Sequence, residues 1–114
     1  GANIAILRGV IRREPDARVL PSGDEVLSIE LSVRDVDRPA DTVPVVWQNP
    51  PTSAFKLAEG DDVVVVGRVR RRFFRSGGAT SSRTEVHADT VLGARSSARL
   101  RTALVPVLET LSVD

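Results

Sequence analysis

One stretch of the sequence gathers side chains that can hold a flexible polyanion. Residues 66–78, VGRVRRRFFRSGG, contain five arginines and two adjacent phenylalanines. A guanidinium group binds phosphate through paired hydrogen bonds, and an aromatic ring accepts a flat base by stacking. The pattern alone leaves two interpretations open. The stretch is either a surface for nucleic acid or a solvated hairpin whose arginines prevent edge pairing and whose phenylalanines pack together.

Strand alternation divides this stretch into two faces. Successive side chains of a strand point to opposite sides, so Arg68, Arg70, Arg72 and Phe74 share one face. In the nucleic-acid interpretation the three guanidinium groups follow the phosphates while Phe74 stacks on a base. Phe73 lies on the other face, where we expect it to pack.

Charge is unevenly distributed along a chain whose formal net charge is only +1. Residues 1–66 hold seven basic and eleven acidic side chains, whereas residues 67–114 hold nine arginines and four acids. The two parts therefore carry −4 and +5. Because charges are screened over about 8 Å at physiological salt, a local positive region can attract a polyanion although the whole molecule is nearly neutral.

Composition argues against several other classes of protein. The chain has no cysteine and one histidine, His87, so we predict no disulfide, metal site or cofactor. No nucleophile motif or phosphate-binding loop is present, and an enzyme is not expected. No apolar run approaches the roughly 20 residues of a membrane-spanning helix. We expect no membrane partner and a cytoplasmic, nucleoid-associated location.

The hydrophobic pattern predicts an all-β domain in residues 3–94. The clearest strand follows a hairpin turn at Pro21–Asp24, where Leu27, Ile29, Leu31 and Val33 alternate with polar residues. A first strand is expected to end at Pro15, with Ile4, Ile6, Gly9 and Ile11 on one side. The remaining strands are expected in residues 43–48, 61–74 and 83–94, with a flexible turn at 75–82.

A short helix is expected between the third and fourth strands, in residues 49–60. Thr52 or Ser53 is its expected cap, Phe55 a core residue and Gly60 its stop. The resulting order, β-β-β-α-β-β, is that of the OB-fold. This fold is a five-stranded Greek-key barrel that binds oligonucleotides on its second and third strands and two adjoining loops.

Residues 95–114 form a separate segment with helical periodicity. Ser96 or Ser97 is the expected cap, and Pro106 is a candidate kink. The apolar positions are Leu100, Ala103, Leu104, Val107, Leu108 and Leu111. Three partners are open for this amphipathic helix: its own domain, a second copy of the chain, or a different protein. The first two are favoured.

Residues 3–92 resemble the bacterial single-stranded DNA-binding (SSB) proteins. Residues 3–33, 57–74 and 83–91 are similar to the first hairpin, fourth strand and fifth strand of that family. The matching positions are Asn3, Leu7, Gly9, Pro15, Arg18, Pro21, Gly23, Val26, Leu57, Gly60, Val63, Gly67, Val69 and Arg70. The resemblance implies an OB-fold that binds single strands without sequence preference, in replication, repair or recombination. We also expect a homo-oligomer, a dimer or tetramer, because linking several weak barrels raises the avidity for a long strand.

The resemblance adds candidate site residues. Trp47 and Phe74 lie at or within one residue of stacking aromatics of the family, although a core indole is an alternative interpretation of Trp47. Two other aromatic positions of the family fall near Asp37 and Asp41, where acids oppose phosphate binding. The acidic partner-recruiting tail typical of the family is not seen. The proposed nucleic-acid contacts are Trp47, Phe74, Arg68, Arg70, Arg72, Arg75, Arg8 and Arg12.

The sequence therefore predicts nonspecific binding of single-stranded DNA, by base stacking and by contacts between arginines and phosphates. Two rivals stay open. One is a protein-assembly module with the same fold and little affinity for DNA, and the other is an RNA-binding OB protein.

Overall fold

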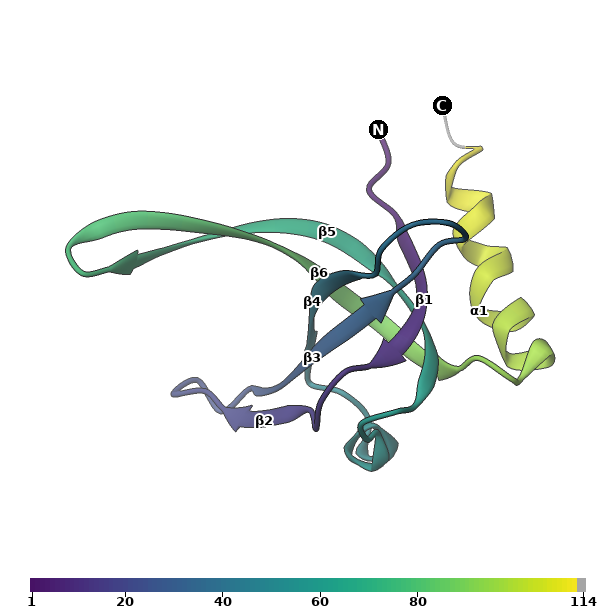
Figure 1. Ribbon diagram of the computed structural model, residues 1–114, viewed down its shortest axis with the longest axis horizontal. Helices are drawn as coiled ribbons and strands as arrows, with labels where there is room; N and C mark the ends of the chain where they lie inside the picture. Colours follow the sequence, from purple (N-terminus) through teal and green to yellow (C-terminus); the bar gives the residue numbers. More distant parts are fainter. Residues whose placement is uncertain (113–114) are drawn as a thin grey trace.

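The computed structural model describes residues 1–112 and consists mostly of β-strands (Figure 1). The strands are β1 (Ala5–Ile11), β2 (Asp16–Val19), β3 (Glu25–Val33), β4 (Asp41–Gln48), β5 (Asp62–Ser76) and β6 (Ala79–Gly93). A single 3-10 turn, η1 (Thr52–Lys56), separates β4 from β5, and the helix α1 (Ser97–Thr110) follows β6.

Five of the strands form a ring of hydrogen bonds. In order around it, β1 pairs with β5, β5 with β6, β6 with β4, β4 with β3, and β3 again with β1. Only the β4–β6 pairing is parallel. The expected count of five strands is wrong, because β2 is a separate sixth strand that pairs with β3 outside the ring.

The core fills the interior of the ring. The predicted alternation of β3 is confirmed, since Leu27, Ile29 and Leu31 are at most 2% exposed. The buried core cluster comprises Ile11, Leu27, Ile29, Leu31, Val45, Trp47, Ala54, Val63, Val65, Val86 and Val91.

The predicted inner face of β1 is partly wrong. Leu7 packs against the core, whereas Ile6 is 45% exposed. Gly9 shows why: a Cβ atom there would lie 2.5 Å from the carbonyl oxygen of Ser32. This position faces inward and has room only for glycine. Because side chains alternate along a strand, Leu7 and the other odd-numbered residues of β1 then face inward, and Ile6 faces outward.

A long arm extends from the ring. Past Gly67 and Val86, β5 and β6 pair only with each other, and we call residues 68–85 the arm. The arm projects well beyond the body of the molecule (Figure 1). The turn expected in residues 75–82 is present but is shorter than predicted, since only Gly77 and Gly78 lie outside the strands. Gly77 and Gly78 have φ values of 59° and 82°, which fit a two-residue hairpin turn that lets both strands continue to the tip.

The expected helix before β5 is only one 3-10 turn. Neither Thr52 nor Ser53 caps it, because Pro51 occupies the N-cap position and no side-chain hydrogen bond is made there. Ala54 is buried in the core, whereas Phe55, predicted to be a core residue, is 45% exposed. Gly60 follows with a φ of 91°, a left-handed conformation that favours glycine.

The C-terminal helix is confirmed as α1, which packs against β5 and β6. Ser96 is its N-cap, without a side-chain hydrogen bond. No described residue of α1 is fully buried, and Leu108 and Leu111 are more than half exposed. Residues 113–114 of the predicted segment lie outside the described part. Within residues 1–112, no helix has the length and apolar character needed to cross a membrane.

Candidate nucleic-acid interface

A groove of about 510 Å³ lies over the outer faces of β3 and β4. Its lining includes the apolar side chains of Leu20, Val26, Pro44 and Val46 beside polar ones such as Ser28, Glu30 and Gln48. The β2–β3 hairpin contributes one side of the groove, and the base of the arm contributes the other. Its volume falls in the range of roughly 300–1,000 Å³ common for ligand sites.

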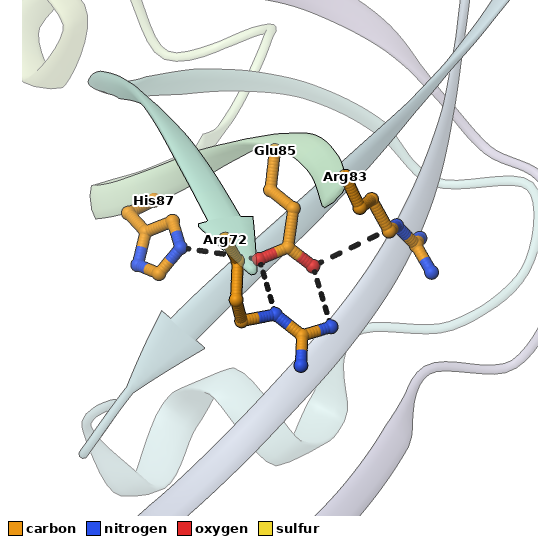
Figure 2. A network of polar contacts seen from close by, with 4 residues as sticks. All are labelled: Arg72, Arg83, Glu85 and His87. Atoms are coloured by element: carbon orange, nitrogen blue, oxygen red, sulfur yellow. Dashed lines mark hydrogen bonds and ion pairs between the residues drawn. The ribbon is translucent and has the colours of Figure 1, made fainter. Parts of the chain in front are cut away.

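Four polar side chains meet where the arm joins the groove (Figure 2). We call Arg72, Arg83, Glu85 and His87 the Glu85 cluster. The Glu85 carboxylate is only 2% exposed and accepts hydrogen bonds from Nε and Nη2 of Arg72, at 3.1 and 3.3 Å. The Nε atom of Arg83 lies 3.7 Å from Oε2 of Glu85, and Nε2 of His87 lies 3.3 Å from Oε1.

The register of β5 and β6 brings this cluster together. Arg72 is directly opposite Arg83, while Glu85 and His87 follow Arg83 at intervals of two residues on β6. All four side chains therefore lie on one face. A buried carboxylate is stable only with partners, and this cluster supplies three.

The electrostatics of the cluster keep Glu85 ionised. Burial alone would raise the pKa of Glu85, but the hydrogen bonds and positive charge of Arg72 outweigh this effect. The hydrogen bond with His87 and the charge of Arg83 act in the same direction. The pKa of Glu85 therefore lies below its ordinary value.

We expect the Glu85 cluster to stabilise the fold in a pH-dependent way. A lowered pKa in the folded state means that the stabilisation is present above the unfolded-state pKa, near 4.5, and is lost as pH falls through the folded-state pKa. Melting temperatures of the wild type and Glu85→Gln should therefore differ at pH 7 and converge below pH 4.5. A difference that stays constant down to pH 3 would contradict this expectation.

The other arginines of the groove are also paired with acids. Nε of Arg13 lies 3.1 Å from Glu30, and Nε of Arg18 lies 3.5 Å from Asp16. These four residues line the groove together with the Glu85 cluster. The charge of the groove is therefore largely balanced, and the positive charge available to a polyanion is concentrated on the arm.

The four side chains predicted to share one face of the strand do lie on one face of the arm. The pairing register puts Arg68, Arg70, Arg72 and Phe74 on the same face as the groove. Arg68 and Arg70 form no ion pair within the described residues. Phe74 is 38% exposed, and Cζ of Arg72 lies 5.5 Å from the centre of its ring. These four side chains can contact one extended ligand.

Three other predicted arginines lie elsewhere. Arg8 donates to Asp62 at 2.9 Å on the β1–β5 side, and Arg12 donates to the hydroxyl of Thr42 at 3.1 Å. Neither lines the groove. Arg75 belongs to the opposite face of the arm, because its position in β5 has the other parity. The structure therefore does not bring these three together with the predicted face.

Trp47 is a core residue and not an exposed stacking platform. It is 6% exposed and pairs with the inward-facing Leu27. Its neighbours Val46 and Gln48 face outward and line the groove instead. Strand alternation with the buried Val45 could have predicted that Trp47 faces inward. The resemblance to the SSB family matched Trp47 to a stacking aromatic only to within one residue, and a shift of one residue reverses the face of a strand.

The residues that line the groove differ in part from those that the sequence analysis singled out. Asp37 and Asp41, predicted to oppose phosphate, do not line the groove. Arg13, Arg18 and Arg83 do line it but were not predicted, because their place depends on how the hairpins fold back.

No protein-family model matches the sequence, and no curated protein matches it either. Within residues 1–112, no three His, Asp or Glu side chains gather as a metal site would require. The function must therefore be inferred from the groove and the arm.

Proposed function

We propose that this protein binds single-stranded nucleic acid, primarily DNA, along the groove and the arm without sequence preference. We also propose that the ring is an OB-fold in which β1 and β2 together stand for the first strand. The ring order, the parallel β4–β6 pair and the helical turn between β4 and β5 support this assignment. The resemblance of residues 3–92 to bacterial SSB proteins supports the same function.

One observation carries the proposal: the groove coincides with the usual ligand surface of an OB-fold. That surface consists of the second and third strands and two adjoining loops. Here the corresponding parts are β3, β4, the β2–β3 hairpin and the arm, and all four contribute to the groove. The arm carries Arg68, Arg70 and Phe74 on the same face, beyond the residues that line the groove.

The proposed mechanism combines stacking with charge. Bases stack on Phe74 and lie over the apolar side chains of the groove, while phosphates contact Arg68 and Arg70. One stacked base contributes about 1–3 kcal/mol, so a single copy should bind weakly. Association of copies through exposed residues of α1, such as Leu108 and Leu111, would raise the avidity for a long strand.

Fluorescence anisotropy with labelled oligo(dT) tests this function. We expect binding at low salt that weakens steadily as salt rises, with little change in Trp47 emission because the indole is buried. Phe74→Ala should cost about 1–3 kcal/mol of binding free energy. Phe55→Ala is the matched control, because Phe55 is similarly exposed but lies in η1 and not on the arm. Absence of binding at low salt would overturn the proposal.

A protein-assembly module is the second candidate, and the charge balance of the groove favours it. Light scattering over a range of concentrations separates the two. Assembly that depends on concentration, combined with no affinity for oligo(dT), would favour the assembly module. Oligo(U) in the same titration compares RNA with DNA, and clearly tighter binding of oligo(U) would reassign the ligand.

A further inference from the structure

Arg72 differs from the other arginines on its face because one of the two bidentate edges of its guanidinium, the edge formed by Nε and Nη2, is already occupied. Its Nε and Nη2 atoms both donate to the Glu85 carboxylate. That carboxylate is 2% exposed and is also held by Arg83 and His87. Paired bonds of this kind are the geometry in which a guanidinium binds phosphate. A phosphate could take the same edge of Arg72 only by displacing a buried, well-partnered carboxylate.

More than half of the Arg72 side chain remains exposed to solvent. Its side chain is 54% exposed and lines the groove, and the two bonds to Glu85 fix the plane of the guanidinium. Cζ lies 5.5 Å from the centre of the Phe74 ring, so the two flat groups are neighbours. Guanidinium planes, like aromatic rings, accept unstacked bases.

We propose that Arg72 contacts a base by stacking and not a phosphate, and that Glu85 is the positioning residue that gives it this role. The inference rests on the proposed function and names the second stacking surface beside Phe74, since Trp47 lies in the core. Arg70, two residues earlier on the same face, is opposite Glu85 in the register but forms no ion pair among the described residues, and we assign it the phosphate contact.

The salt dependence of binding distinguishes the two roles. For a single strand, each phosphate contact contributes about 0.7 to the slope of log affinity against log salt. Arg72→Ala should lower the affinity for oligo(dT) about 5- to 100-fold while leaving this slope unchanged. Arg70→Ala is the matched control and should lower the slope by about 0.7. A fall of about 0.7 for Arg72→Ala as well would overturn the inference.

Glu85→Gln tests the positioning role. Once the carboxylate charge is removed, Arg72 can turn its edge to a phosphate, so the slope should rise by up to about 0.7. An unchanged or lower slope would contradict the role of Glu85. Circular dichroism at the assay temperature establishes that each variant is folded.

A double variant covers the case in which a single substitution prevents folding. Arg72→Met with Glu85→Leu removes both charges together, and replacing a buried ion pair by apolar residues is often tolerated. It should show the same loss of affinity without a change of slope. Unchanged affinity would overturn the inference. If the wild type itself does not bind oligo(dT), both the proposed function and the stacking role of Arg72 are refuted. If the wild type binds but Arg72→Ala lowers the salt slope, only the stacking role is refuted.

Discussion

Gly67→Ala is expected to destabilise the protein by about 3 kcal/mol or more. A Cβ atom at this position would clash with the carbonyl oxygen of His87 and lie 2.9 Å from Cα of Ala88. Both atoms belong to the backbone of β6, so no side chain can move aside to make room. The two strands would have to separate at the point where the arm leaves the ring. Urea denaturation measures this loss as a change in the free energy of unfolding.

Gly93→Ala is the matched control for this substitution. Gly93 lies in the same strand pair, and a Cβ atom there would meet nothing within 4 Å. We expect its free energy of unfolding to stay within about 0.5 kcal/mol of the wild type. If Gly67→Ala behaved like Gly93→Ala, the close approach of β5 and β6 at the start of the arm would be refuted.

Gly67 also explains how the arm obtains its direction. The register of β5 and β6 shifts between Val66 and Gly67, since Val66 pairs with Thr90 while Gly67 pairs with Ala88. One residue of β6, Asp89, is left without a partner in this register. Such a bulge bends and twists a strand pair locally. The bulge therefore lies where it can direct the arm away from the ring.

The hydrophobic alternation was enough to predict the buried face of β3, because each side of that strand has a uniform character. It was not enough for β1, where Ile6 and Leu7 are equally apolar. Their assignment depends on Gly9, whose inward position lies against the backbone of Ser32. Sequence alone does not reveal which strand crosses at that point, so the choice of face could not be made.

The candidate site was also predictable from the sequence only in part. The predicted face of the arm agrees with the pairing register, because the period of two is fixed by strand geometry. The Glu85 cluster could not be predicted, since it joins Arg72 and Glu85 across a hairpin. Their pairing requires the two-residue turn at Gly77 and Gly78, and a turn longer by one residue would shift the register.

The double variant Arg68→Gln and Arg70→Gln is expected to show the largest loss of DNA binding. Neither side chain has an acidic partner within the described residues, so each is available for a phosphate. Two phosphate contacts contribute about 1.4 to the salt slope, and at low salt their loss should lower affinity by about 10- to 100-fold. Anisotropy titrations with labelled oligo(dT) at several salt concentrations measure both quantities.

The control must remove the same charge from another place. Arg99→Gln with Arg101→Gln changes the net charge by the same amount on α1, which lies on the opposite side of the molecule from the arm (Figure 1). Because screening limits the reach of a charge to about 8 Å, this variant should keep nearly the wild-type slope. Equal losses in the two double variants would mean that overall charge, and not the face of the arm, attracts the nucleic acid. A loss confined to Arg68 and Arg70 would locate the phosphate path on the groove-facing side of the arm.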